Sequence, residues 1–297
     1  MLGRSSAAIW YEIQRNRVRG RYDPKKAHHK AYVRRKYAKY QGMKIVEHDG
    51  LRREVRARLY DDQSPEAVAG YITNMRHDLP HISKNAIYRY IASVYGRRIE
   101  THRWLRKKRH HRRRAPYAHL PRRTFIDKRP LYINERQRAG DAEFDFIVSG
   151  KSGKGILLVV VDRKLRASFL EKIFPVSFAA LTRAATRIKK RYPEWKTGTT
   201  DNDILLQQYK RLEQTIDIRI FFCHPYHGWE KGTVENTNGV VRRDIPKGSD
   251  ISKRSRSFIG RLEEKLNRRP MKVLNFRTPR EALAAHRRRR INKKRPV

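Results

Sequence analysis

Three acidic residues stand in settings that could hold metal ions. Asp145 lies inside an apolar strand pattern, Asp201 ends a β-prone run at a polar turn, and Glu235 falls in the first turn of a helix that begins near Thr233. Thirty-three residues separate Asp201 from Glu235. A bare charge in an apolar strand is costly to bury. Carboxylates on a strand, a strand end and a helix start suit a site for two divalent cations, which clamp the attacking and leaving oxygens of an in-line phosphoryl displacement.

Each of these acids also has a simpler explanation. With Gly232 as the N-cap, Glu235 is at the third helical position, where a glutamate often completes a capping box. Asp141, Glu143 and Asp145 alternate along one strand and therefore point to the same face, so their spacing does not choose the first metal ligand. Because the chain has 72 lysines and arginines, any single acid could instead be a salt-bridge partner.

A longer motif surrounds Glu235. It consists of Pro225-Tyr226, Trp229 to Gly239, Arg242 and Pro246-Lys247-Gly248, followed downstream by Leu266 to Pro270 and Arg277 to Glu281. In these residues the chain closely resembles the insertion sequence 30 family of bacterial transposases, and the resemblance covers nearly the whole chain. That family is of the DDE type, with a ribonuclease-H-like catalytic domain and a spacing of thirty-three residues between its second and third acids.

The resemblance implies a site and a reaction. The run Gly140 to Asp145 aligns with the opening motif of the family, whose last aspartate is the metal ligand, and this selects Asp145. We therefore expect Asp145, Asp201 and Glu235 to bind two Mg²⁺ ions, with Mn²⁺ as a substitute, because carboxylates suit hard cations. A metal-activated water would cleave the DNA at the element end, and the freed 3′-hydroxyl would then attack target DNA. The partners would be double-stranded DNA, as terminal inverted repeats and target, and a homodimer or higher oligomer.

Several residues depart from the family pattern. The family usually has Trp at the position of Ala142 and Gly at that of Phe144, while Asp203 replaces a usual Gly and Leu205-Leu206 a Glu-Phe pair. These departures motivate an alternative hypothesis, a decayed or domesticated transposase that binds DNA without cleaving it. A basic structural protein of a ribonucleoprotein would require the three acids to coincide by accident.

The composition fits a polyanionic partner. The formal net charge is +43 and the pI is near 11.0, which favours nucleic acid but also suits ribosomal or membrane-surface roles. A single cysteine, Cys223, excludes a disulfide framework and a cysteine-based zinc site. We find no signal peptide and no apolar run of membrane length. We therefore expect no membrane association and a place in the bacterial cytoplasm, associated with the nucleoid.

The expected fold is a multidomain α+β chain, with a helical DNA-binding region before a ribonuclease-H-like mixed α/β domain. We predict a partial helix-turn-helix and basic helix at 1–45, a trihelical helix-turn-helix domain at 46–100, a basic linker at 101–130, the catalytic domain at 131–285 and a basic tail at 286–297. The run from Leu2 to Ile13 predicts a turn, an N-cap serine and an amphipathic helix. It resembles the recognition half of a family module whose earlier helices are missing here, so we expect either a late start or a shortened module.

The trihelical domain follows from three apolar stripes. Leu51, Val55 and Leu59 mark the first helix, Ser64-Pro65-Glu66 opens the second with Ala67, Val68 and Ile72 inward, and Ser83 caps the third, which holds Ile87, Tyr90 and Ile91. The last helix would offer Lys84, Asn85 and Arg89 to the major groove. Three-helix bundles that bind nothing have similar spacing, and the excess of basic residues favours DNA binding.

The catalytic region shows the order expected of a mixed sheet. Strand patterns span 141–148, 155–161 and 166–173, a helix follows at 178–190, and a strand then ends at Asp201. A helix at 205–212, a strand at 218–222, the Glu235 helix and a helix after Asp250 complete it, and the tail at 287–295 is expected to be disordered. Strands with little sequence between them should pair antiparallel.

Other polar residues receive weaker assignments. Asn238 and Arg242 fall on the Glu235 face of their helix and would orient the site or contact phosphate. We interpret Asp162 as a surface ion-pair partner, and His224 and His227 as loop residues without metal-ligand partners that could touch DNA. Cys223 is expected to be a small core residue rather than a nucleophile.

Overall fold

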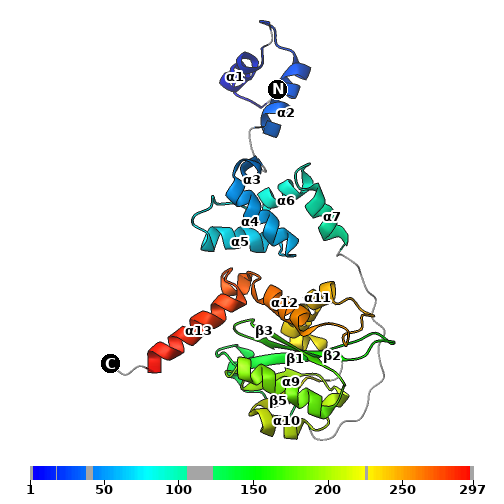
Figure 1. Ribbon diagram of the computed structural model, residues 1–297. Helices are drawn as coiled ribbons and strands as arrows, with labels where there is room; N and C mark the ends of the chain where they lie inside the picture. Colours follow the sequence, from blue (N-terminus) through cyan, green and yellow to red (C-terminus); the bar gives the residue numbers. More distant parts are fainter. Residues whose placement is uncertain (1–2, 18, 38–42, 106–122, 225–226, 295–297) are drawn as a thin grey trace.

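The computed structural model of the chain describes residues 3–17, 19–37, 43–105, 123–224 and 227–294 (Figure 1). Two helices begin it, α1 (Ser6–Asn16) and α2 (Pro24–Tyr37). The side chain of Ser5 accepts the backbone N–H of Ala8 at 3.3 Å and caps α1, as the sequence predicts. The central part of the predicted basic linker, 106–122, lies outside the described residues.

A region of five helices spans residues 43–105, where the sequence predicts a trihelical domain. Its helices are α3 (Met43–Glu47), α4 (Asp49–Tyr60), α5 (Pro65–Met75), α6 (Lys84–Ala92) and α7 (Arg97–Leu105). Ser64 and Ser83 cap α5 and α6 through their hydroxyl groups, and the predicted apolar positions are buried except for Ala67, which is half-buried. Lys84, Asn85 and Arg89 are all exposed along α6, where a nucleic acid could reach them.

A five-stranded mixed sheet forms the second part of the described chain. Its strands are β1 (Asp141–Val148), β2 (Ile156–Asp162), β3 (Ser168–Ile173), β4 (Thr197–Thr200) and β5 (Arg219–Phe222), in the spatial order β3-β2-β1-β4-β5. The first three pair antiparallel, whereas β4 pairs parallel with both β1 and β5. This is the ribonuclease-H-like arrangement, and it confirms the fold class expected from the sequence.

Helices cover both faces of the sheet (Figure 1). One face carries α9 (Phe178–Arg191) and α10 (Tyr209–Ile216) over Ala142, Phe144 and Phe146 of β1. The other carries α11 (Gly232–Asp244) and α12 (Arg256–Asn267) over Ile147 and the alternate residues of β2. Because side chains alternate along a strand, Asp141, Glu143 and Asp145 point toward α11.

Both edges of the sheet have partners that are not strands of this sheet. At β3, Asn267 and Glu263 of α12 accept the N–H groups of Ser168 and Leu170 at 2.9 and 2.6 Å. At β5, the N–H of Phe222 donates to the carbonyl of Thr124 at 2.8 Å. Residues 124–125, which precede the short helices η1 (Ile126–Lys128) and α8 (Leu131–Asn134), thereby continue the sheet by one bridge.

The helical domain contacts the sheet domain at α12. Lys265 of α12 donates to Asp62, at the end of α4, at 2.7 Å. The ring of Phe276 lies so close to α5 that a Cβ on Gly70 would be 2.2 Å from it. Phe276 follows the short helix η4 (Lys272–Leu274).

Two helical predictions are wrong in their extent. The helix expected at 205–212 is instead a short turn, η2 (Ile204–Leu206), and the separate helix α10 that begins at Tyr209. Asp203 causes the early turn by accepting the N–H of Leu205 at 2.8 Å. The tail expected to be disordered continues α13 (Pro279–Lys294), which Thr278 and Glu281 cap reciprocally and which Arg287 ties to Glu194 at 3.0 Å.

Asp162 is not the surface ion-pair residue that its basic neighbours suggest. Its side chain is fully buried at the end of β2, where it accepts the N–H groups of Gly140 and Lys164 at 2.8 Å, that of Leu165, and the hydroxyl of Tyr192. Burial raises the pKa of Asp162 and the pKa of Tyr192. Asp162 therefore closes a turn from inside the core.

We predict that Asp162→Ala lowers the free energy of unfolding by about 3 kcal/mol, because it leaves several buried N–H groups without an acceptor. Urea denaturation would measure the change. Asp49→Ala is the matched control, since Asp49 is an exposed ion-pair residue and its loss should cost less than about 1 kcal/mol. Equal midpoints for the two variants would contradict the structural role of Asp162.

Candidate metal centre beside helix α11

The three acids of β1 have different partners. Asp141 pairs with Arg138 at 2.9 Å and accepts the hydroxyl of Thr197 at 2.8 Å, so it links β1 to β4 and the preceding loop. Glu143 and Asp145 both face α11, but they contact different groups on it. The sequence spacing does not select the metal ligand among these three acids. Their contacts assign structural roles to Asp141 and Glu143 and leave Asp145 as the candidate ligand.

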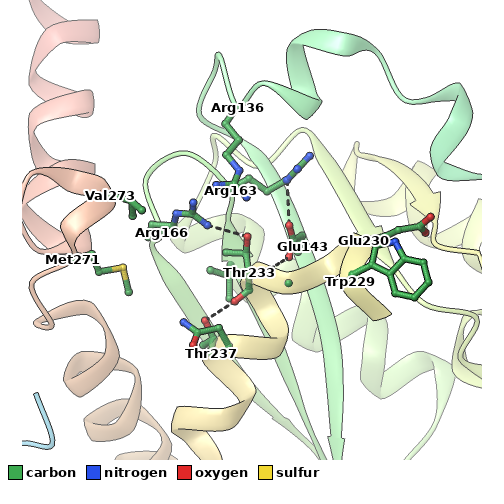
Figure 2. A pocket seen from close by; sticks show the side chains of 13 residues that line it. Arg136, Glu143, Arg163, Arg166, Trp229, Glu230, Thr233, Thr237, Met271 and Val273 are labelled. Atoms are coloured by element: carbon green, nitrogen blue, oxygen red, sulfur yellow. Dashed lines mark hydrogen bonds and ion pairs between the residues drawn. The ribbon is translucent and has the colours of Figure 1, made fainter. Parts of the chain in front are cut away.

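Glu143 caps helix α11 from the neighbouring strand. One of its oxygens accepts the N–H groups of Thr233 and Val234 at 2.8 and 2.9 Å, and the other lies 3.2 Å from Nε of Arg163 (Figure 2). A carboxylate at a helix N-terminus satisfies free N–H groups and complements the helix dipole. The sequence suggests Gly232 as the N-cap, but the helix begins at that residue and its N-cap is Lys231.

Lys231 lies between the first two predicted metal ligands. Its Nζ is 3.1 Å from Oδ1 of Asp145 and 2.6 Å from Oδ2 of Asp201, although these acids are far apart in the sequence. The lysine is 95% buried. Burial alone would lower the pKa of Lys231, but the two carboxylates outweigh it and raise that pKa above its ordinary value. Burial raises the pKa of Asp145, and the ammonium group opposes this shift.

Helix α11 also presents Glu235, Asn238 and Arg242 at this end of the sheet. Nδ2 of Asn238 donates to Oδ2 of Asp145 at 2.8 Å, which fixes the orientation of that carboxylate. Glu235 lies three residues before Asn238 and therefore on the same helix face. Arg242 donates to the carbonyl of Val148 at 3.2 Å, and burial lowers its pKa.

The three predicted metal ligands, Asp145, Asp201 and Glu235, do not bring their carboxylate oxygens within 4.8 Å of one another. Among the described residues, one group of three histidine, cysteine, aspartate or glutamate side chains brings its ligand atoms within 4.8 Å of one another, and it consists of His224, His227 and Glu230. The interpretation of both histidines as residues without a ligand partner is therefore wrong. Asp145 and Asp201 instead meet through the ammonium group of Lys231.

The polar atoms around Lys231 fit a divalent cation. Oδ1 of Asp201 and Oδ1 of Asn238 are buried oxygens with no hydrogen-bond partner in the described part of the chain. Buried oxygens without partners are uncommon and costly. The other side-chain polar atoms of these two residues contact Lys231 and Asp145, and oxygen ligands are those that Mg²⁺ and Mn²⁺ prefer.

A cavity lined by three arginines opens beside the N-terminus of α11. It has a volume of about 310 Å³ and is lined by Arg136, Arg163, Arg166, Thr233 and Thr237, among others (Figure 2). Arg166 donates to the hydroxyl of Thr233 at 2.9 Å. Burial, followed by the neighbouring guanidinium of Arg136, lowers the pKa of Arg166.

Phe144, which departs from the family pattern, packs well against its neighbours. The ring of Phe144 meets those of Trp195 and Phe146 edge-on, with centroids 6.2 and 6.3 Å apart. A Cβ on Gly198 of β4 would lie 2.6 Å from Phe144, so a glycine there makes room for the larger side chain. Cys223 is buried as predicted, and burial raises the pKa of its thiol to about 12, which argues against a nucleophile.

No described helix is long and apolar enough to cross a membrane. The order and direction of the strands are those of a ribonuclease-H-like domain. No family model matches the chain. It is, however, 33% identical over 94% of its length to the transposase for insertion sequence element IS4351 of Bacteroides fragilis, and the match covers 86% of that protein.

A second relative is transposase InsI for insertion sequence element IS30A of Escherichia coli, which is 27% identical over 95% of this chain and 76% of its own length. The chain belongs to the insertion sequence 30 family of transposases. Among solved structures, the catalytic core domain of BIV integrase is 14% identical, with a TM-score of 0.39 over 51% of this chain and 99% of that one.

We predict that Lys231→Met strengthens Mn²⁺ binding about tenfold or more, because the ammonium group and a metal ion compete for the same two carboxylates. Titration calorimetry on the metal-free protein would measure the affinity. Lys210→Met removes an exposed lysine that pairs with Glu213 and is the matched control, with unchanged affinity expected. Equal Mn²⁺ affinity in Lys231→Met and the parent chain would show that Lys231 does not hold the position of the metal.

Proposed function

We propose that this protein is a DNA transposase that cleaves DNA at the ends of its element and transfers the 3′ strand to target DNA. The observation that carries the proposal is the meeting of Asp145 and Asp201 at one buried cation position, beside the helix face that presents Glu235. Family membership supplies the reaction class. The geometry supplies carboxylates that could hold cations, and these cations would balance the charge of the reacting phosphate.

Asp145, Asp201 and Glu235 would hold two Mg²⁺ ions, for which Mn²⁺ could substitute. When bound, such ions lower the pKa of a water nucleophile and stabilise the charge of the phosphoryl transition state. Asn238 keeps the carboxylate of Asp145 turned toward the site by donating to its Oδ2. Lys231, displaced from between the two aspartates, would bring its ammonium group to a phosphate oxygen of the DNA.

Two features could position the DNA strands. The three arginines of the cavity, Arg136, Arg163 and Arg166, outnumber its two glutamates, and the cavity lies next to the α11 N-terminus, so it could hold a backbone phosphate. Arg242 is half-buried near the site with one guanidinium nitrogen that has no partner among the described residues, and it could serve the same purpose. We assign both a phosphate-positioning role, without a role in reading bases.

The N-terminal helices would recognise the element ends. Helix α6 exposes Lys84, Asn85 and Arg89 on a basic domain, and side chains of these types can contact base edges or phosphates in the major groove. Because two element ends must be joined to one target, the proposal also includes a homodimer or larger assembly on DNA. The net charge of +43 supports tight and salt-sensitive DNA binding.

A decayed transposase that only binds DNA is the competing proposal. It rests on Ala142, Phe144 and Asp203, which depart from the usual family residues. The complementary packing of Phe144 against Gly198, and the capping role of Asp203 on Leu205, favour a maintained catalytic domain over a decayed one. Both proposals predict DNA binding, so cleavage decides between them.

We predict that Asp145→Asn, Asp201→Asn and Glu235→Gln each abolish Mg²⁺-dependent nicking and strand transfer on plasmid DNA that carries the flanking sequence of the gene. The substitutions keep the shape of each side chain but remove a metal ligand charge. DNA binding, measured by fluorescence anisotropy, should remain within about threefold of the parent protein. Cleavage that survives in one variant would exclude that acid, and a parent protein that binds but never cleaves would favour the decayed transposase.

We predict that Asn85→Ala and Lys84→Ala weaken DNA binding in different ways. If Asn85 contacts a base edge, its loss should cost about 1–3 kcal/mol on element ends and little on random DNA. If Lys84 contacts phosphate, its loss should weaken both DNAs equally and reduce the salt dependence by about one counterion. Binding isotherms over a salt series would separate the two effects, and unchanged isotherms for both variants would remove α6 from the interface.

A further inference from the structure

A second cluster of ligand atoms lies in the loop that leads into α11. His224 follows β5, and His227 and Glu230 come from the segment that includes the short helix η3 (Gly228–Lys231). Nδ1 of His224 and Nδ1 of His227 lie 3.2 and 3.3 Å from the same oxygen, Oε1 of Glu230. Three ligand atoms from residues spaced three apart therefore converge outside the group formed by Asp145, Asp201 and Lys231.

The separations are compatible with three ligands of one metal ion. A hydrogen bond between an imidazolium and a carboxylate is usually about 2.7–2.9 Å long. In a tetrahedral zinc site with bonds near 2.1 Å, by contrast, neighbouring ligand atoms are about 3.4 Å apart. The two nitrogen–oxygen distances match that spacing, and all three ligand atoms lie within 4.8 Å of one another.

The surroundings orient the ligands as metal sites do. Nε2 of His224 lies 2.8 Å from Oδ2 of Asp127, so an Nε2–H group can donate to that carboxylate and leave Nδ1 unprotonated as a ligand. The ring of Phe125 stacks on His224 with centroids 5.3 Å apart, and that of Trp229 stacks on His227 at 4.4 Å. The other oxygen of Glu230 accepts the N–H of His224 at 2.8 Å, which fixes the carboxylate.

We propose that His224, His227 and Glu230 form a transition-metal site, most suited to Zn²⁺, with Asp127 as the residue that orients His224. Imidazole ligands favour Zn²⁺ over Mg²⁺, so this site and the carboxylate site would select different ions. Two histidines and one glutamate leave a fourth position for water. The ion would link His224, which follows β5, to Glu230, which directly precedes Lys231.

The test uses the full chain in the triple variant Asp145→Asn, Asp201→Asn, Glu235→Gln, so that the carboxylate site cannot bind the probe. After treatment with a chelator, the protein is titrated with Co²⁺, and the visible absorption of a four-coordinate ion is recorded. We expect one equivalent to bind, Zn²⁺ to displace it, and an excess of Mg²⁺ to leave it in place. No absorption in this background would overturn the proposal.

Single changes in the same background test each assigned residue. His227→Ala should abolish the absorption band, and Asp127→Asn should weaken Co²⁺ binding about 10–100-fold without abolishing it. His77→Ala, which removes a histidine of the helical domain, should change nothing. If the His227→Ala protein binds Co²⁺ as tightly as its parent, the ion is adventitious and the proposal fails.

A second readout covers variants that fold poorly. Hydrogen exchange of the peptide that contains residues 227–233 should slow on addition of one equivalent of Zn²⁺ in the parent chain. The His227→Ala variant, at the same Zn²⁺ concentration, should show no such slowing. Equal exchange with and without Zn²⁺ in the parent chain would mean that the three side chains form an ion-pair network only.

Discussion

The carboxylate of Glu143 joins the central strand to helix α11, and the geometry of the candidate site depends on this contact. Its oxygens receive two N–H groups of the helix and face Arg163, all in a buried environment. Each hydrogen bond to a buried charge contributes about 1.5–3 kcal/mol. The contact fixes where α11 begins, and therefore where Lys231 and Glu235 stand relative to Asp145.

Charge at the candidate metal site is balanced locally, although the chain as a whole is strongly basic. The chain has a formal charge of +43, yet its candidate metal site brings two carboxylates to one buried lysine. Removing such carboxylates from water without a cation would be costly, and Lys231 supplies that cation within the chain. A divalent ion would carry the same sign with more charge, so the metal-free and metal-bound states can share one scaffold.

The sequence predicts much of the fold because its patterns are local. The strand at 141–148 matches the prediction at both ends, and the serine caps of α1, α5 and α6 lie where expected. Local signals fail where a partner is distant in the chain. Asp162 has two basic neighbours, but Gly140 and Tyr192 determine its role, and the end of α13 is ordered by a pair with Glu194.

The same distinction applies to the site. The motif and its spacing predict Asp145, Asp201 and Glu235 as metal ligands. The structure adds Glu143 as a cap and Lys231 as a counter-ion, which no periodicity indicates. The "Trp-Glu-Lys-Gly" run does place Lys231 close to Glu235 in sequence, but its contacts with two strands depend on the tertiary fold. The three-residue spacing of His224, His227 and Glu230 is visible in the sequence, but their convergence is seen only in the structure.

The contacts at the two edges of the sheet affect how copies of the chain could associate. Side chains of α12 take the N–H groups of β3, and residues 124–125 take the outer side of β5. N–H groups that already have acceptors are not available to a strand from another molecule, which lowers the tendency of these edges to extend the sheet and aggregate. Two copies of the chain could pair through these edges only by breaking those contacts, whereas contact through helices and loops would leave each sheet unchanged.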